Sequence, residues 1–357
     1  MILILSSIIV LILINLIMIF SLKRLVSDSK NESDYVNISI VIAARNEAEN
    51  IPNLINHLKN ISYPGQMFEV IIVDDNSIDE TKNLLLNFTK TLNNFFIFAL
   101  NDVSGKRNAL SMGISRAKYE YILITDADCI PDSGWLKAYS KKFKEGYNLL
   151  FGIAPYNQHK KIVNKISCFE NLRNSILSFS MALIGIPYTA AARNFGFAKN
   201  AFEEIGGYTK TQDTLSGDDD LLIREAVKRK LKIGVVPDKN SFVYSETKKT
   251  FSEYLKQRAR HTQTSFHYLK THQLMLGLWH SMNLFFLFSP ILIIINPGFG
   301  IMLPVKIVID FILVRLNQKK FGYKFSVQEI VYLQIFYEVL LIIHFLNAKF
   351  SQVKWKQ

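Results

Sequence analysis

The sequence predicts an α/β fold: a central domain with a mostly parallel sheet, flanked at both ends by helices that could cross a membrane. In the middle of the chain, short apolar runs alternate with segments of helical spacing, which is typical of parallel sheets covered by helices. The first 20 residues and most of 274–348 are strongly apolar, and 49% of the 357 residues are hydrophobic. We therefore expect three regions, at 1–22, 34–272 and 274–348.

The N-terminal apolar stretch is expected to be a membrane anchor. Residues 1–20 carry no charge, and about 20 such residues span a bilayer as a helix. Lys23 and Arg24 follow the stretch and no small-residue cleavage site is evident, which argues against a signal peptide. By the positive-inside rule, the chain from residue 21 onward then lies in the cytoplasm, attached to the inner or plasma membrane.

The C-terminal block contains three more apolar stretches. They are 284–295, 301–314 and 330–346. The first two predict spanning helices joined by a tight turn, and the basic loop 315–324 suits the cytoplasmic side. The third either crosses the membrane or lies in the interface, because Lys349, Lys354 and Lys356 follow it.

Charge and cysteine content narrow the classes of partner. The net charge of +12 fits an anionic membrane leaflet or phosphate-bearing ligands. No nucleic acid is expected as a partner, because no basic stripe with interleaved aromatic residues is present. Cys129 and Cys168 show no metal-ligand spacing, and a cytoplasmic location argues against a disulfide.

Polar residues follow three of the strands predicted in the central domain. The expected strands are 37–44, 68–73, 95–100 and 121–124, and the expected helices are 48–58, 79–88 and 108–117. The polar clusters are Arg45-Asn46-Glu47, Asp74-Asp75 and Asp126 with Asp128. Each alone is ordinary loop chemistry. Ligands of parallel sheets bind beyond the carboxyl ends of the strands, so three clusters at that edge favour a ligand site.

The pair Asp126 and Asp128 indicates what the ligand is. If the strand continued through them, both would lie on one face, with Ala127 and Cys129 on the other. Two adjacent carboxylates repel unless a cation or hydrogen-bond donors lie between them. The plain alternative is a strand end followed by a turn.

Two basic residues in an earlier loop, which precedes the expected helix 108–117, extend this interpretation. With Lys106 and Arg107, the carboxylates suit a divalent cation and a diphosphate. Neither a Walker loop nor a GxGxxG motif follows the first strand, which argues against nucleoside triphosphate hydrolysis and dinucleotide binding.

Seven motifs in register resemble the membrane-bound glycosyltransferases of family 2, which have the GT-A fold. They are SIVIAARNEAENI, EVIIVDDNSIDET, SGKRNAL, ILITDADCIPDSGWL, RNFGFAKNAFEEIGGY, SGDDDLL and QRARH. The resemblance covers the whole central domain in the family's order. It implies an inverting enzyme of the hexosyltransferase type that takes a sugar from a nucleotide diphosphate sugar, with UDP-sugars as the expected donors.

The resemblance also implies roles for individual donor-side residues. Ala43 and Glu47 border the nucleotide, Asp74 and Asp75 bind the base, and Lys106 lines the pocket; Asp126 lies near the ribose and diphosphate, and Asp128 is the ligand of Mg²⁺ or Mn²⁺. Residues 193–207 correspond to the acceptor-side segment, whose helix and GGY turn are expected to support the site.

The catalytic base is expected in SGDDDLL, where two alignments disagree. Matching a GED motif makes Asp219 the base, whereas matching TEDxDL makes it Asp218; we favour Asp219. Acidic residues at a helix N-terminus also interact well with the helix dipole, and both roles can hold together.

The last motif, QRARH, resembles QxxRW. Arg260 would face the diphosphate and Gln257 would help to close the acceptor channel. His261 replaces the family's tryptophan, which stacks on the acceptor sugar in processive synthases, so chain elongation loses support. The competing interpretation is a basic helix at the membrane interface.

Taken together, these features predict transfer to a lipid or membrane-associated glycan acceptor. One alternative is a subunit of a processive polysaccharide synthase, which would need enough helices to form a pore. Another is a non-catalytic nucleotide-sugar-binding scaffold for a partner synthase. The chain keeps Asp128, Asp218, Asp219 and Arg260, which favours an enzyme. A nucleotidyltransferase is disfavoured because the first loop is not glycine-rich and basic.

Overall fold

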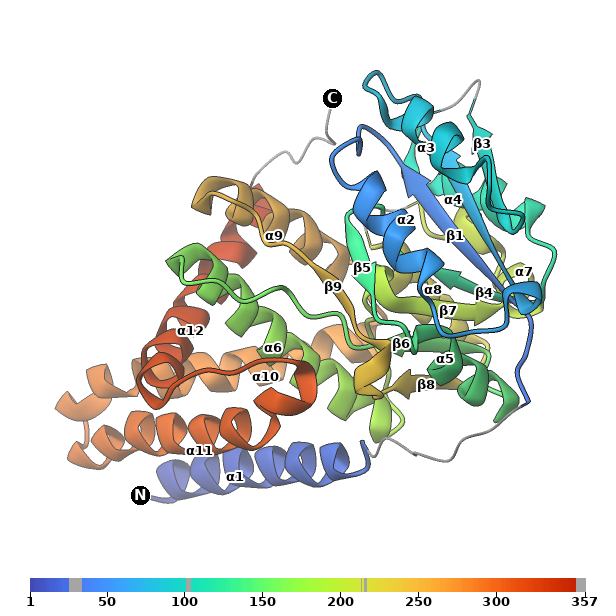
Figure 1. The fold of residues 1–357 in the computed structure, drawn as a ribbon. Helices are drawn as coiled ribbons and strands as arrows, with labels where there is room; N and C mark the ends of the chain where they lie inside the picture. Colours follow the sequence, from blue (N-terminus) through green and yellow to red (C-terminus); the bar gives the residue numbers. More distant parts are fainter. Residues whose placement is uncertain (26–33, 101–103, 213, 215–216, 351–357) are drawn as a thin grey trace. The chain divides into compact units, whose positions relative to one another are not determined.

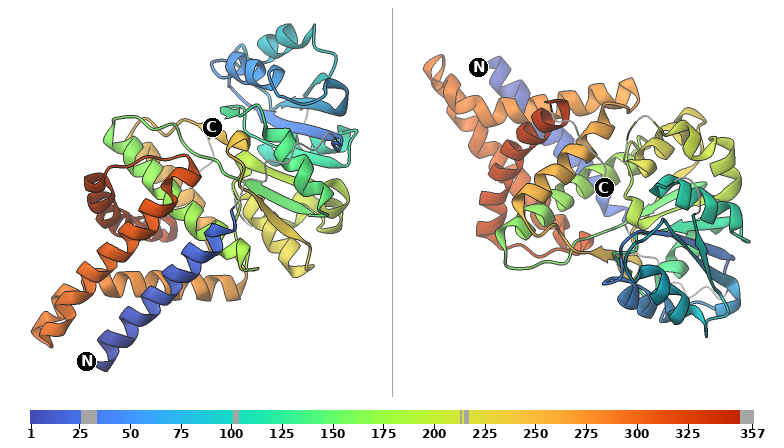
Figure 2. Two further views of the ribbon diagram at one scale, coloured as in Figure 1. Left: turned by 60° about the horizontal axis from the view of Figure 1, so that its bottom comes forward. Right: turned by 90° about the horizontal axis from the view of Figure 1, so that it is seen from above.

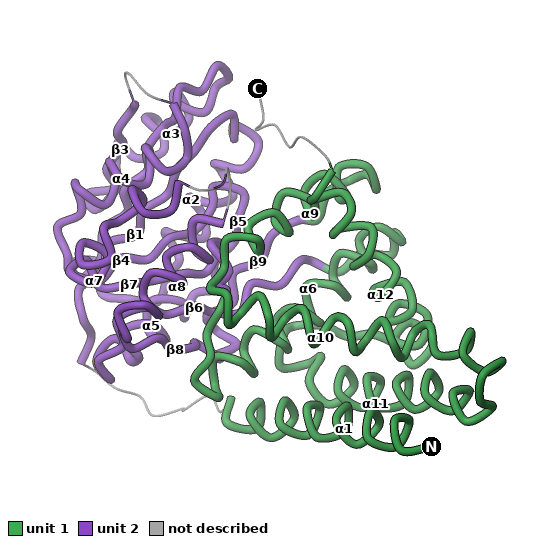
Figure 3. The backbone as a smooth tube through the Cα atoms, turned by 180° about the vertical axis from the view of Figure 1, so that it is seen from behind, with its two compact units in different colours: residues 1–25, 158–188, 247–357 green, residues 26–157, 189–246 purple. Residues whose placement is uncertain are grey.

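The computed structural model describes residues 1–25, 34–100, 104–212, 214 and 217–350, which form two compact units. The sheet unit comprises residues 26–157 and 189–246, and the helical unit comprises 1–25, 158–188 and 247–357 (Figure 3). Residues 158–188 and 247–272, which lie inside the predicted central domain, therefore group with the helices.

A seven-stranded sheet forms the centre of the sheet unit (Figure 1), with the strand order β3-β2-β1-β4-β7-β6-β8. The strands are β1 (Ile38–Ala44), β2 (Phe68–Asp74), β3 (Phe95–Ala99), β4 (Tyr121–Ile124), β6 (Leu149–Gly152), β7 (Phe195–Ala198) and β8 (Ile233–Val236). Only β7 runs antiparallel to its neighbours, so the predicted mostly parallel sheet is confirmed.

Helices cover this sheet because its strands are apolar on both faces. They are α2 (Ile51–Lys59), α3 (Thr81–Thr89), α4 (Lys106–Arg116), α5 (Trp135–Lys144), α7 (Lys199–Glu204) and α8 (Asp218–Lys228). All seven residues of β2 are buried. Helix α4 packs against β1 and β2 at Gly113, where an added Cβ would lie 2.4 Å from Val41 Cγ1. This close approach lets α4 pack directly against β1 and β2.

The helical unit contains α1 (Ile2–Lys23), α6 (Ile162–Leu183), α9 (Phe251–Ser265), α10 (Lys270–Phe288), α11 (Met302–Asn317) and α12 (Val327–Phe350). Among the described residues, three helices are long and apolar enough to cross a membrane: Ile2–Lys23, Lys270–Ile294 and Val327–Phe350. Helix α1 lies alongside α11 (Figures 1 and 2).

The predicted apolar stretches correspond to these helices with two differences. The stretch 284–295 contains only the end of α10, which begins at Lys270, and continues into a 3₁₀ segment. The stretch 301–314 lies in α11, which has 16 residues and is therefore shorter than the roughly 20 needed to cross a bilayer by itself. Helices α10 and α11 are joined by 3₁₀ turns at Ser289–Ile294 and Pro297–Ile301. The stretch 330–346 lies within the 24-residue α12.

A buried ionic network joins four helices of this unit. Lys306 Nζ of α11 donates to Asn283 Oδ1 of α10 (2.6 Å), Asp310 Oδ2 of α11 (2.6 Å) and Glu338 Oε1 of α12 (2.9 Å). Arg173 of α6 pairs with the other oxygen of Asp310 at 3.4 Å. All five side chains are buried, and because buried charges are costly unless they are paired, the network holds α6, α10, α11 and α12 in one arrangement.

Candidate active site

The carboxyl ends of β1, β2 and β4 meet at one edge of the sheet. The three strands are parallel neighbours, and Ala44, the last residue of β1, is in register with Asp74, the last residue of β2. The backbone N–H of Asp75 donates to the Ala44 carbonyl oxygen at 2.8 Å. This edge gathers the carboxylates predicted to contact the donor.

Asp75 organises the loop before α4. Its carboxylate accepts hydrogen bonds from the Gly105 N–H (2.9 Å) and the Ser104 hydroxyl (2.8 Å), and Arg45 lies 3.8 Å away. Asp74 is buried, and its Oδ2 accepts a long bond from the Ser77 N–H at 3.4 Å. Its Oδ1 is buried without a hydrogen-bond partner among the described residues, which leaves an acceptor at the predicted nucleotide site.

The loops after β1 and β2 are hydrogen-bonded to each other. The Asn46 N–H donates to Ser77 Oγ at 3.0 Å, and the Ile78 N–H donates to Asn46 Oδ1 at 2.9 Å. Glu47 accepts from the Asn50 amide at 2.6 Å, and Ala43 lies half-buried near the end of β1. Glu47 therefore belongs to two loops that hydrogen bonds hold together, and Ala43 lies in the strand that leads into the first of them.

Asp126 and Asp128 lie in a turn and not along a strand, so of the two predicted geometries the plain alternative, a strand end followed by a turn, is the one present. Strand β4 ends at Ile124, and a bond from the Cys129 N–H to the Asp126 carbonyl (3.2 Å) closes the turn before β5 (Cys129–Pro131). Cys129 was predicted on the opposite face, and this was wrong: its thiol donates to Asp128 Oδ1 at 3.4 Å. The turn brings side chains together that strand alternation would separate.

The turn offers a site that fits a divalent cation. Three ligand atoms lie within 4.8 Å of one another, one each from Asp126, Asp128 and Cys129. Carboxylate oxygens suit Mg²⁺ or Mn²⁺. Burial, with Asp128 and Asp126 beside it, raises the pKa of the Cys129 thiol well above its ordinary value, so the thiol stays protonated. The two carboxylates are thus the residues that fit the ion.

Two basic side chains at the start of α4 neutralise carboxylates of this edge. Lys106 Nζ lies 2.5 Å from Asp126 Oδ1, and Arg107 forms an ion pair with Asp218 at the start of α8. Burial alone would lower the pKa of Lys106, but Asp126, Asp218 and Asp219 raise it above its ordinary value. Lys106 therefore stays a cation beside the predicted diphosphate position.

The three aspartates of SGDDDLL have different surroundings, although Ser216 of this motif lies outside the described residues. Asp218 is buried and paired with Arg107. Asp220 accepts from the Thr189 hydroxyl (2.5 Å) and the Ala190 N–H (3.1 Å). Burial, followed by the charges of Asp220 and Asp218, raises the pKa of Asp219 well above its ordinary value.

The acceptor-side segment contributes a buried residue that sequence reasoning missed. Asn194 is fully buried, and its Oδ1 accepts from Trp135 Nε1 (2.8 Å) and the Tyr139 hydroxyl (2.7 Å). The GGY turn contains Gly206 and Gly207 at φ of 83° and 55°, a backbone region that favours glycine. Asn194 fixes β7 against α5, and no local pattern marks such a long-range role.

Gln257 and Arg260 both lie on α9 in the helical unit, where they are half-buried. The motif residue between them, Arg258, is buried and forms an ion pair with Glu170 of α6 at 3.0 Å. Sequence reasoning gave Arg258 no role because it occupies a variable position of QxxRW. The signal that could have identified it is Tyr254, one helical turn earlier on the same face.

Part of the chain matches a known protein family and several curated proteins. Residues 39–206 match the family described as Glycosyl transferase family 2. The poly-beta-1,6-N-acetyl-D-glucosamine synthase of Staphylococcus epidermidis is 30% identical over 173 residues, which are 47% of this chain and 41% of that protein. The glycosyltransferase AglE of Haloferax volcanii is 32% identical over 100 residues, 28% of this chain and 33% of that protein. This chain thus spans less than half the length of these curated relatives.

A solved structure extends the likeness to the whole chain. The mannosyltransferase PcManGT from Pyrobaculum calidifontis, in complex with GDP-Man and Mn²⁺, has 15% sequence identity and a TM-score of 0.59, covering 97% of this chain and 99% of that chain. At this identity the likeness concerns the fold, and the expected GT-A fold is confirmed.

Proposed function

We propose, from the premise that this chain belongs to glycosyl transferase family 2, that it moves a sugar from a nucleotide diphosphate sugar to a lipid or membrane-associated glycan. The observation that carries this proposal is a cluster of charges at one edge of a GT-A sheet. Asp74 and Asp75 lie at the end of β2, Asp126 and Asp128 follow β4, and Lys106 begins α4. We propose that the sheet unit lies in the cytoplasm, because Lys23 and Arg24 follow the first apolar helix.

On the donor side, the chain's own residues bind and orient the nucleotide sugar. Asp74 and Asp75 would receive the base, with Ala43 and Glu47 beside it, and Lys106 would turn from Asp126 toward the diphosphate. Asp126 and Asp128 would hold Mg²⁺ or Mn²⁺, which as a Lewis acid stabilises the charge of the departing diphosphate. Arg260 would add a second cation toward the same group, with Gln257 beside the acceptor.

The transfer itself is a single displacement. The acceptor hydroxyl oxygen bonds to the anomeric carbon as the bond from that carbon to the diphosphate oxygen breaks, which inverts the configuration. The hydroxyl proton goes to a carboxylate of α8. The raised pKa of Asp219 favours it as the acceptor of this proton, whereas the TEDxDL alignment favours Asp218, which Arg107 holds in place.

The donor and acceptor are tested together in membranes that contain the protein. A panel of labelled UDP-sugars and GDP-sugars is supplied, because one relative is named for an N-acetylglucosamine polymer and a structural neighbour holds GDP-Man. The products are then separated into lipid-soluble and polymeric fractions. Label in the lipid fraction is expected; label only in polymer would favour a processive synthase, and no label from any donor would favour the scaffold.

The metal site gives a second test. Chelation of divalent cations, or Asp128→Asn, should lower transfer roughly a thousandfold, since metal stabilisation of a leaving group supplies several kcal/mol. Asp132→Asn is the matched control, because this carboxylate lies four residues further along the same segment, outside the Asp126-Asp128-Cys129 group. Unchanged turnover in Asp128→Asn would contradict the assigned role.

A further inference from the structure

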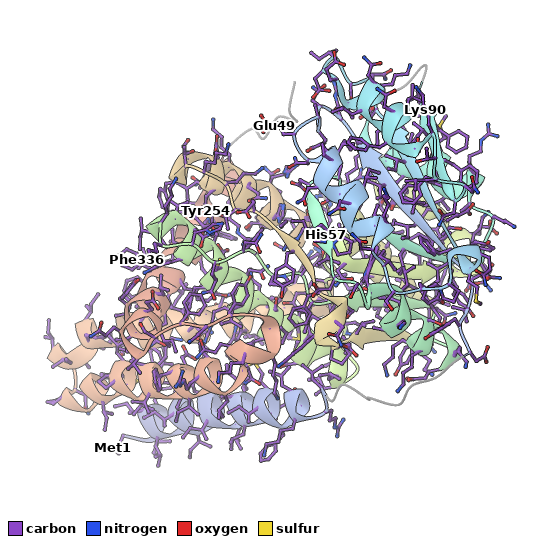
Figure 4. All side chains as sticks on the ribbon, viewed as in Figure 1. Met1, Glu49, His57, Lys90, Tyr254 and Phe336 are labelled. Carbon is purple, nitrogen blue, oxygen red and sulfur yellow. The ribbon has the colours of Figure 1, made fainter. Side chains whose placement is uncertain are left out.

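The buried face of α9 contacts a carboxylate of α6. Glu170 Oε2 accepts a hydrogen bond from the Tyr254 hydroxyl and lies 3.0 Å from Arg258 Nε. Glu170 Oε1 lies 3.5 Å from His344 Nε2 of α12, and the Tyr254 hydroxyl lies 3.1 Å from the same nitrogen. These four residues, which we call the Glu170 cluster, join α6, α9 and α12 (Tyr254 is labelled in Figure 4).

All four members of the Glu170 cluster are buried, with exposed fractions of 5% for Glu170, 8% for Arg258, 1% for Tyr254 and 2% for His344. Burial alone would raise the pKa of Glu170, but Arg258, His344 and the Tyr254 hydroxyl lower it to about 2. Glu170 is therefore an anion at neutral pH. A buried anion keeps its donors in place, because leaving it unpaired is costly.

The cluster fixes how α9 is rotated about its axis. At 3.6 residues per turn, Arg258 and Arg260 project about 160° apart around the helix, while Gln257 and Arg260 are about 60° apart. Arg258 and Tyr254 contact α6 and α12. Gln257 and Arg260 therefore lie together on a different face of α9. A rotation of α9 by one residue would move both away from that side.

We infer that Arg258 is a positioning residue, and that the Glu170 cluster sets the orientation of the helix that presents Gln257 and Arg260. The functional part of this inference rests on the proposed sugar transfer, in which Arg260 serves the diphosphate. The structural part does not, because it concerns only contacts within the helical unit.

The test uses the full chain in detergent with the variants Arg258→Gln, Glu170→Gln and Arg258→Lys. Hydrogen–deuterium exchange of the α9 amides should be about tenfold faster in the two Gln variants, because local opening is no longer opposed by the ion pair. The exchange of α4, in the sheet unit, should stay unchanged. Arg258→Lys keeps the cation and should restore part of the protection.

The matched control is Glu329→Gln. Glu329 of α12 pairs with Lys165 of α6 at 2.6 Å, so it joins two of the same helices, but its side chain is more exposed and the pair does not involve α9. This variant should leave α9 exchange and transfer unchanged. A variant that is simply misfolded would show faster exchange in α4 as well.

The kinetic part distinguishes positioning from donor binding. In Arg258→Gln, kcat should fall about tenfold while the KM for the donor stays within about twofold, because the donor-binding residues of the sheet unit are untouched. The Arg258→Gln/Glu170→Gln double variant should lose no more than either single variant, since the two act through one contact. Unchanged α9 exchange in both single variants would overturn the inference. A parent protein without any transfer would instead overturn the proposed function and leave the exchange result to decide the positioning role.

Discussion

The two units use charged residues in opposite ways. In the sheet unit, Lys106 and Asp126 pair at the end of a strand with about a quarter of each side chain exposed. In the helical unit, Lys306 and Asp310 pair with 3% and 2% exposed. The first pair is open to solvent, so that a phosphate or a metal ion can replace either partner. The second pair is buried, so no ligand can replace either residue, and the pair stabilises the structure.

The largest effect on the rate of transfer is expected at the solvent-accessible charged residues of the sheet unit. Asp219→Asn should reduce the rate of transfer roughly 10²–10⁴-fold, because general-base catalysis contributes that much. Donor affinity should stay close to that of the parent and is measured by titration with the nucleotide. Glu145→Gln serves as the control, since Glu145 pairs with Lys142 at the end of α5 and has no part in the candidate site. If Asp218→Asn stops transfer and Asp219→Asn does not, Asp218 is the base.

Substitutions in the buried ionic network of the helical unit should change its stability. Lys306→Met leaves Asp310 and Glu338 without their shared cation and should lower the free energy of unfolding of the helical unit by about 3–5 kcal/mol. Thermal unfolding in detergent measures the loss. Adding Glu338→Gln to this variant should recover part of it by removing one unpaired charge. An unaltered midpoint in the single variant would show that the network does not stabilise the unit.

The smallest effect concerns pH. Burial and the neighbouring carboxylates raise the pKa of Asp219, and a base acts only when ionised, so kcat/KM should rise as pH rises through this raised value. The unfolded chain ionises Asp219 at lower pH, so the group destabilises the native state increasingly above its ordinary pKa. Asp219→Asn should therefore raise the unfolding midpoint at neutral pH. A lower midpoint would contradict the raised pKa.

Local patterns were enough to predict much of the sheet unit. The apolar runs of β1, β2 and β4, and the carboxylates after them, are read directly from the sequence because strand direction and burial fix both. The strand 121–124 was predicted with the bounds of β4, and a turn after it was the plain alternative. The bond from Cys129 to Asp128 was not predicted, since Cys129 lies in β5, which pairs with the distant β9 (Val243–Ser245).

Contacts distant in the chain were not predictable from the sequence. Tyr254 and Glu170 lie 84 residues apart in the chain, and the bonds of Asn194 reach α5. No periodicity connects such residues, because each is buried by the packing of elements whose order in space the sequence does not state. For the same reason Lys306 and Asp310 could be noticed inside an apolar stretch, but their partners Glu338 and Arg173 could not.

Helix α6 has a consequence for the order in which the protein is made. Its Glu170 and Arg173 stand one turn apart, and each enters a different buried ionic cluster. Among the described residues, the charged partners of these two side chains lie on α9, α11 and α12 and are synthesised later, whereas the sheet unit ends at residue 246. Since domains can fold while the chain is still being synthesised, α6 emerges with two charges whose partners have not yet been made. The contacts that orient α9 are therefore complete only after His344 of α12 has been made.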